Sequence, residues 1–198
     1  YDMLRMFRAH GMVREARSQG IKDRYAAESD DLTPDFIFAY PGYNVRSTEI
    51  AATMGRSQLR RLDANNVTRS ENLAAFLDQL DGDRYRTEFR TEGSSNYAFT
   101  LVLRQPDPVL YEAVTSALRA HGVEYRRGLS GGGNQMRQPY LRKALGDLNF
   151  ARYPHTEHVH FYGFYIGNYP GLERDKIDRL CGILNALPTG EHVKAGNA

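Results

Sequence analysis

The sequence is poor in cysteine and has no long apolar run. Cys181 is the single cysteine in 198 residues, so the chain cannot form an internal disulfide or a multi-cysteine zinc or iron–sulfur site. No segment approaches the roughly 20 consecutive apolar residues that a membrane-spanning helix needs, and the first residues do not resemble a secretory leader. We therefore expect a cytoplasmic protein with no membrane partner.

Net charge is small as well. The 26 Lys and Arg residues are nearly balanced by 24 Asp and Glu residues, which gives a formal charge of +2. A field that gathers nucleic acid needs a large excess of one sign, and the pairs Arg60-Arg61 and Arg126-Arg127 do not supply it. We expect no nucleic-acid partner. With 41% hydrophobic residues, the chain can form a folded core as one domain, or as one domain with an extension.

The first residues carry a helical pattern with no start methionine before it. Met3, Leu4 and Phe7 have the spacing of one helix face, so the chain is expected to begin inside a structural element and to be part of a longer protein. Residues 12–35 are polar and show neither helical nor strand periodicity, which predicts a long surface loop. Because long loops in compact domains are often functional, we expect this loop to belong to a site.

The remainder of the chain predicts alternating helices and strands. Apolar residues at helical spacing predict helices over 47–62, 73–80, 108–122, around 141–145 and over 177–187. Runs rich in β-branched and aromatic residues predict strands over 97–103, 123–127 and 164–166. Ser47 and Thr48 are suitable helix caps, and so is Asp107 followed by Pro108. The predicted fold is α/β (α+β), with a βαβ-like small sheet packed on helices.

The segment Gly42-Tyr43-Asn44-Val45-Arg46 is a candidate anion site. Its glycine permits a tight turn, and the Asn44 amide and Arg46 guanidinium then lie close to the start of the 47–62 helix, whose free N–H groups favour an anion. The alternative is a capped turn in which both side chains bond only to the backbone. Spacing by itself favours this alternative.

Three histidines and a glycine run are further candidates. Three imidazoles can hold zinc if they converge, but His155 and His158 share a helix face from which His160 points away, so we expect no metal. Gly131-Gly132-Gly133 lacks both the Lys-Ser/Thr of a P-loop and the dinucleotide fingerprint. We interpret it as a flexible loop near a substrate cleft, with a simple surface turn as the alternative.

Two motifs make the chain resemble a known family. Arg8-Ala9-His10-Gly11, followed after the loop by Tyr40-Pro41-Gly42-Tyr43-Asn44-Val45-Arg46-Ser47-Thr48-Glu49, resembles the DegT/DnrJ/StrS family of sugar aminotransferases. Within that family the chain is most similar to the GDP-4-keto-6-deoxymannose 3-dehydratase type. A weaker similarity extends to Glu124-Tyr125-Arg126 and to Phe164-Tyr165-Ile166-Gly167-Asn168, so that the resemblance covers most of the chain.

The resemblance implies a homodimeric fold-type-I enzyme that uses pyridoxal 5'-phosphate (PLP). Residues 1–46 would form the opening helix and the active-site loop that join the large cofactor domain. Residues 47–188 would form the C-terminal small domain, and residues 189–198 a mobile tail. The resemblance implies that Asn44 contacts the cofactor phosphate across the dimer, with Tyr43 beside it. The residues implied to bind a nucleotide-sugar substrate are His10, Arg14, Arg46 and Arg126.

The residue that decides the reaction is expected to lie outside the chain. In this family a lysine binds the cofactor in the aminotransferases and a histidine replaces it in the dehydratases, at a position before this segment. None of the four lysines of the chain has that sequence context; they are Lys22, Lys143, Lys176 and Lys194. We therefore expect no catalytic residue in the chain itself.

The expected function is that of the C-terminal domain of a PLP-dependent aminotransferase acting on nucleotide-linked keto sugars, in surface polysaccharide or deoxysugar biosynthesis. An amino donor such as glutamate would be a second substrate. One alternative is a PLP-dependent or pyridoxamine-phosphate-dependent sugar 3-dehydratase. Another, of a different class, is a non-catalytic module for dimerisation or sugar-nucleotide binding.

Overall fold

The chain folds into two units, and each is built from two separate stretches of sequence. The computed structural model describes residues 1–128, 133–146 and 148–190. Unit 1 combines Tyr1–Gln58 with Arg127–Phe161, and unit 2 combines Leu59–Arg126 with the chain from Tyr162 onward. Each unit is therefore held together by contacts between residues that are far apart in the sequence.

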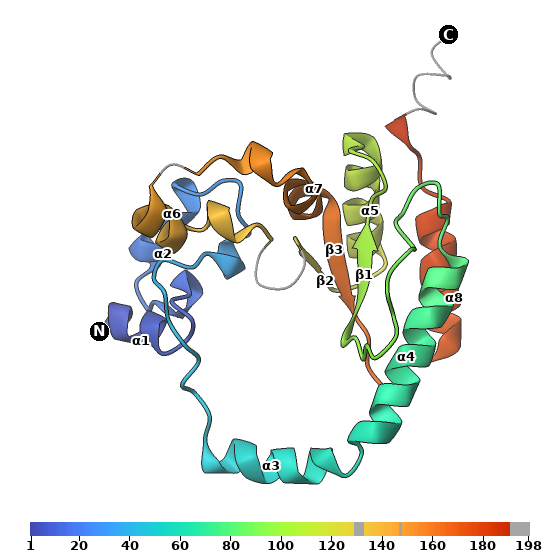
Figure 1. The fold of residues 1–198 in the computed structure, drawn as a ribbon, viewed down its shortest axis with the longest axis horizontal. Coiled ribbons are helices and arrows are strands. Elements are labelled where there is room, and N and C mark those ends of the chain that lie inside the picture. Colours follow the sequence, from blue (N-terminus) through green and yellow to red (C-terminus); the bar gives the residue numbers. More distant parts are fainter. Residues whose placement is uncertain (129–132, 147, 191–198) are drawn as a thin grey trace. The chain divides into compact units, whose positions relative to one another are not determined.

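Unit 2 contains a small sheet of three strands (Figure 1). The strands are β1 (Ala98–Val102), β2 (Tyr125–Arg127) and β3 (Gly163–Gly167), in the spatial order β1-β3-β2. β1 and β3 are antiparallel, with Phe99 opposite Ile166 and Leu101 opposite Phe164. The last strand in sequence thus lies between the first two, and Arg127 at the end of β2 begins the second stretch of unit 1.

Helices α4 (Leu62–Gln79), α5 (Pro108–Ala120) and α8 (Arg174–Asn185) pack with this sheet, and α4 and α8 lie side by side (Figure 1). Their apolar faces share one core with the strands, in which the rings of Phe76 and Phe99 stack 4.5 Å apart. Burying this apolar surface is the main driving force for folding the unit. The predicted small sheet packed on helices is confirmed.

Two of the predicted helix caps are present. Asp107 Oδ1 accepts hydrogen bonds from the backbone N–H groups of Val109 (2.9 Å) and Leu110 (3.0 Å), and Pro108 occupies the first helical turn of α5. Thr48 Oγ1 accepts from the N–H of Ala51 at 3.2 Å, at the start of α3 (Glu49–Leu59). The predicted helix over 47–62 is therefore α3 and the beginning of α4, which are separate helices.

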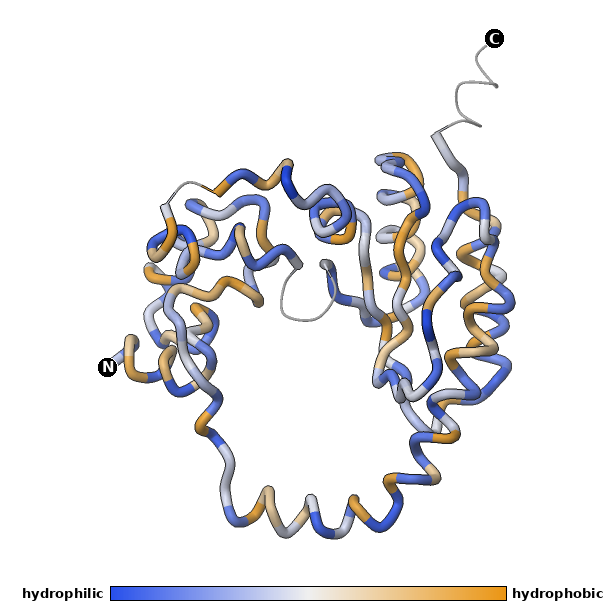
Figure 2. The backbone as a smooth tube through the Cα atoms, in the orientation of Figure 1, coloured by the Kyte–Doolittle hydropathy of each residue, from blue (hydrophilic) through white to orange (hydrophobic). Residues whose placement is uncertain are grey.

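Helix α3 has no buried residue, although apolar positions recur along it (Figure 2). Ile50, Met54 and Leu59 are 76%, 62% and 67% exposed. Exposed apolar side chains in such a row are typical of a surface that packs against another part of a protein. No helix in the described ranges 1–128, 133–146 and 148–190 is long and apolar enough to cross a membrane.

Unit 1 consists of short helices and turns. Its α-helices are α1 (Asp2–Phe7), α2 (Gln19–Ala27), α6 (Pro139–Leu145) and α7 (Pro154–Tyr162). Its 3-10 helices are η1 (Val13–Glu15), η2 (Pro34–Phe36), η3 (Gln135–Arg137) and η4 (Phe150–Arg152). The core of this unit is a separate cluster of apolar side chains: Met6, Val13, Ala16, Tyr25, Leu32, Ile37 and Ala39.

The predicted long loop over 12–35 was wrong, because this stretch contains η1, α2 and the start of η2. Tyr25 is the only buried residue of α2, so the helix has no apolar stripe that periodicity detects. Short helices depend mainly on tertiary packing, and here Tyr25 supplies it by inserting into the core. Of the predicted tail, residues 191–198 lie outside the described residues, as do Gly131 and Gly132 of the glycine run.

Candidate functional site

The two N-terminal motifs lie side by side in unit 1. The N–H of His10 donates to the carbonyl of Tyr43 at 3.1 Å, and the N–H of Val45 donates to the carbonyl of Arg8 at 3.0 Å. Ala9 and Asn44 face each other as an antiparallel bridge. Segments more than 30 residues apart therefore form one short strand-like pair that fixes the turn holding Tyr43 and Asn44.

Glycine is required where these segments cross. Gly11 has φ +75°, and a Cβ atom there would lie 1.8 Å from the carbonyl oxygen of Tyr40. A Cβ atom on Gly42 would lie 2.9 Å from the carbonyl oxygen of Phe7. His10 has φ 61° and is the only non-glycine residue with positive φ in the described part of the chain. Such unfavourable backbone angles cluster at functional sites.

Asn44 is oriented by its neighbour Arg46. Asn44 Oδ1 accepts from both the backbone N–H and the Nε of Arg46, each at 3.2 Å, and Arg46 Nη1 contacts Glu15 Oε1 at 3.2 Å. The amide nitrogen Nδ2 of Asn44 has no hydrogen-bond partner among the described residues, and the side chain is exposed. The oxygen thus makes the predicted turn contact, while two N–H donors stay free for a ligand.

A pocket of about 420 Å³ opens beside this turn. Its walls come from both N-terminal motifs and from the segment around α6: His10, Phe38, Tyr40, Pro41, Gly42, Tyr43, Gln135 and Tyr140. Neither Gln135 nor Tyr140 was predicted from the sequence. They lie about 90 residues beyond the motifs, and no local pattern marks them.

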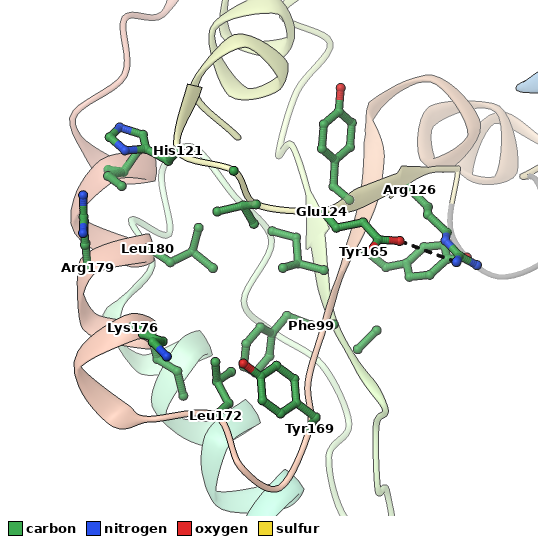
Figure 3. A pocket seen from close by; sticks show the side chains of 18 of the residues that line it. Phe99, His121, Glu124, Arg126, Tyr165, Tyr169, Leu172, Lys176, Arg179 and Leu180 are labelled. Carbon is green, nitrogen blue, oxygen red and sulfur yellow. Dashed lines mark ion pairs between the residues drawn. The ribbon is translucent and has the colours of Figure 1, made fainter. Parts of the chain in front are cut away.

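The predicted substrate residues Arg14 and Arg126 do not line this pocket. The guanidinium of Arg14 lies 5.3 Å from the ring centre of Phe36. Arg126 belongs to unit 2, where it pairs with Glu124 at 3.6 Å and lies over the ring of Tyr165 (Figure 3). There it lines a different pocket of about 720 Å³ between α8 and the sheet. The roles of Arg14 and Arg126 in substrate binding stay predictions.

A charged cluster anchors η3 to the rest of unit 1. Arg137 Nη1 lies 2.6 Å from Asp31 Oδ2, Arg137 also pairs with Glu157, and its guanidinium lies 4.3 Å from the ring centre of Phe150. The hydrogen bond from Arg137 is the main reason why the pKa of Glu157 is lowered. These ion pairs are largely shielded from water. Without Arg137, Glu157 would have no ion pair among the described residues, and Asp31 would keep only Arg142, at 3.2 Å.

His160 has a structural role beside this cluster. Its Nδ1 accepts from the N–H of Asn134 at 3.1 Å, and its Nε2 lies 3.0 Å from the carbonyl oxygen of Asp31, which assigns the proton to Nε2. Burial lowers the pKa of His160, so the neutral form is favoured. Within residues 1–128, 133–146 and 148–190, no three or more His, Cys, Asp or Glu side chains are placed to hold a metal ion.

The short helices and the small three-stranded sheet match a fragment of fold-type-I PLP enzyme structures. The chain matches the model of the DegT/DnrJ/EryC1/StrS aminotransferase family over residues 1–185, and it belongs to this family. The resemblance drawn from the two motifs is thereby confirmed.

Among curated relatives, the chain is 26% identical to a GDP-4-keto-6-deoxy-D-mannose 3-dehydratase from Escherichia coli O55:H7, over 93% of the chain and 47% of that protein. It is also 26% identical to an enzyme of the same name from Yersinia pseudotuberculosis, over 93% and 46%. The lipopolysaccharide biosynthesis protein RfbH of Salmonella typhimurium is 29% identical, over 72% and 33%. The chain thus spans about half the length of the 3-dehydratases it matches.

Solved structures give the same result. A GDP-4-keto-6-deoxymannose-3-dehydratase with a trapped PLP-glutamate geminal diamine matches with a TM-score of 0.61 and 25% identity, over 93% of this chain and 47% of that one. A putative sugar aminotransferase, Spr1654 from Streptococcus pneumoniae, matches in its PMP form with a TM-score of 0.56 and 15% identity, over 91% and 42%. The second match shows the fold alone.

Proposed function

We propose that this chain is the C-terminal part of a PLP-dependent enzyme that removes the C3 hydroxyl of a nucleotide-linked 4-keto sugar. Two curated relatives at 26% identity and a solved structure at 25% identity are named 3-dehydratases, which supports dehydration. The aminotransferases among the matching structures are only 15 to 20% identical. Transamination, which the family description supports, is the second candidate.

The observation that carries this proposal is the free amide nitrogen of Asn44. The oxygen of the same amide accepts two hydrogen bonds from Arg46, so the amide cannot flip without losing them, and the residue is exposed. An exposed, oriented amide donor fits a phosphate oxygen of PLP. PLP supplies an electron sink for cleavage of bonds near the sugar carbonyl. The residues of this chain would bind and orient the cofactor and the sugar.

The exposed apolar row on α3 supports a further part of the proposal, a homodimer. The large domain or the second subunit would cover Ile50, Met54 and Leu59. In the dimer, Asn44 of one subunit would contact the cofactor of the other subunit. The nucleotide sugar would bind with His10 and Arg46, and glutamate would serve as the amino donor.

Asn44→Ala in the full-length protein should weaken PLP binding about 10- to 100-fold. Loss of a hydrogen bond to a charged phosphate costs about 1.5 to 3 kcal/mol, which corresponds to that range. The melting temperature of the apo protein should change little, because Asn44 is exposed. Fluorescence titration with PLP and thermal unfolding of the apo protein, both on the same variant, separate the two effects.

Asn149→Ala is the matched control. Asn149 is also exposed, and its Oδ1 accepts from the N–H of Ala151 at 3.0 Å, two residues further on, just as Asn44 accepts from Arg46. This variant should lose a comparable turn contact with no change in PLP affinity. If Asn44→Ala, like Asn149→Ala, leaves the affinity for PLP unchanged, Asn44 is a turn residue and the proposed phosphate contact is wrong.

A further inference from the structure

The pocket beside the turn has a wall that comes from much later in the sequence. Gln138 is fully buried, and its side-chain amide forms hydrogen bonds with the backbone at both ends of the segment 36–38. Gln138 Oε1 accepts from the N–H of Phe38 at 2.8 Å, and Gln138 Nε2 donates to the carbonyl of Phe36 at 2.8 Å. Met12 forms an antiparallel bridge with Phe38, and the Gln138 amide satisfies backbone groups of Phe36 and Phe38 that would otherwise need other partners.

The backbone around Gln138 continues this pairing. The N–H of Tyr140 donates to the carbonyl of Phe38 at 3.1 Å, and Lys143 Nζ lies 5.3 Å from the ring centre of Tyr40. As a result Tyr140 faces the same pocket as His10 and Tyr43, with its hydroxyl 3.3 Å from Gln135 Oε1. Gln138 therefore fixes the distance between Tyr140 and the N-terminal motifs.

The chemistry of this pocket indicates which part of a nucleotide sugar it takes. Among the described residues, its lining contains no Lys, Arg, Asp or Glu, but it does contain four aromatic rings, an imidazole and a side-chain amide. A diphosphate needs cationic partners, whereas a neutral sugar ring packs its C–H face on aromatic rings and hydrogen-bonds through its hydroxyls. The pocket is lined by Tyr43, next to Asn44, so it lies beside the proposed cofactor contact, where the reacting sugar must be.

We propose that this pocket binds the hexose ring of the nucleotide sugar, that Tyr140 is a specificity-determining residue that hydrogen-bonds a sugar hydroxyl, and that Gln138 is its positioning residue. This inference rests on the proposed function, since it assumes a nucleotide-sugar substrate. It assigns the sugar end to residues of unit 1 that neither N-terminal motif contains.

The test uses the full-length protein with PLP and two probes, GDP and GDP-mannose, in calorimetric titrations. GDP-mannose carries the hexose but no keto group to react, so the difference between the two affinities reports the sugar contact. The wild-type protein should bind GDP-mannose more tightly than GDP. Tyr140→Phe should weaken GDP-mannose binding about 2- to 10-fold, the effect of one hydrogen bond to a neutral group, and leave GDP binding unchanged.

Three further variants complete the design. Tyr153→Phe removes a hydroxyl from an exposed tyrosine outside the pocket and should change neither affinity. Gln138→Leu keeps the approximate volume but removes both amide contacts, so it should lower GDP-mannose affinity at least as much as Tyr140→Phe does. Gln138→Glu keeps the acceptor for the N–H of Phe38 and should recover part of that loss. A purely structural Gln138 would lower the melting temperature without changing the affinity of the folded protein.

The failure of this inference is distinguishable from that of the proposed function. If the wild-type protein binds GDP-mannose more tightly than GDP and Tyr140→Phe leaves that difference intact, Tyr140 does not contact the sugar and only the inference fails. Equal losses for both probes would assign the pocket to the nucleotide and would also overturn it. If the protein retains PLP but binds neither probe, the nucleotide-sugar substrate itself is wrong, and the inference falls with it.

Discussion

Gly11→Ala in the full-length protein is expected to lower the free energy of unfolding by about 2 to 5 kcal/mol and to abolish PLP binding. Left-handed backbone costs a residue with a Cβ atom about 1 to 2 kcal/mol, and overpacking adds about 1 to 3 kcal/mol. Here the new methyl group would lie 1.8 Å from the carbonyl oxygen of Tyr40, which is backbone and cannot rotate away. The segments that hold His10 and Asn44 must separate to admit it. Denaturant unfolding and PLP titration measure the two effects.

Gly55→Ala is the control for this prediction. Gly55 lies inside α3 at ordinary helical angles, and a Cβ atom there meets nothing within 4 Å. Alanine should therefore stabilise the helix by about 0.5 to 1 kcal/mol, because it restricts the unfolded chain more than glycine does. A Gly11→Ala variant as stable as wild type, with normal PLP affinity, would show that the crossing of the two motifs is not as tight as described.

Arg137→Met should destabilise the protein by about 3 to 5 kcal/mol at neutral pH. The substitution removes the cation of two shielded ion pairs: it leaves the Glu157 carboxylate with no other ion pair among the described residues and leaves Asp31 with only its 3.2 Å contact to Arg142. A broken buried ion pair is most costly when one charge is left unpaired. Methionine keeps apolar contact with Phe150, so lost packing contributes less. Urea unfolding at pH 7.5 measures the difference in the free energy of unfolding.

The same substitution should matter less in acid. Because Arg137 lowers the pKa of Glu157 in the folded protein, the stabilisation from this carboxylate is fully present above the ordinary glutamate pKa of about 4.3 and is lost as the pH falls through the lower, folded value. The difference between wild type and Arg137→Met should therefore shrink as the pH falls from 7.5 into this range. A difference that is constant over this interval would show that packing, not charge, accounts for the effect.

Elements with local signals were predictable from the sequence, and those that depend on distant contacts were not. The cap of α5 was found because Asp107 and the N–H groups it binds are separated by only two and three residues. Helix α2 was missed because its single anchor, Tyr25, is stabilised by a core that the sequence pattern does not reveal. The order β1-β3-β2 was likewise not specified, since strand pairing is a non-local property.

The candidate site divides in the same way. Asn44 and His10 were identified from motifs that are continuous in the sequence, and the structure brings them together through the pair Ala9 and Asn44. Gln138 and Tyr140 were missed because each reaches a partner about 100 residues away. For Arg14 the motif identified the residue but could not predict where its side chain lies. Only the structure shows that its guanidinium stacks on the ring of Phe36.

The proposed dehydration is tested most directly by the product that the full-length protein forms from GDP-4-keto-6-deoxy-D-mannose with PLP and glutamate. Nuclear magnetic resonance of the purified product identifies the substituents at C3 and C4 of the sugar. We expect the C3 hydroxyl to be lost and the C4 carbonyl to be retained. An amine at C4 with the C3 hydroxyl in place would make the protein an aminotransferase, and an unaltered sugar would contradict the proposed substrate.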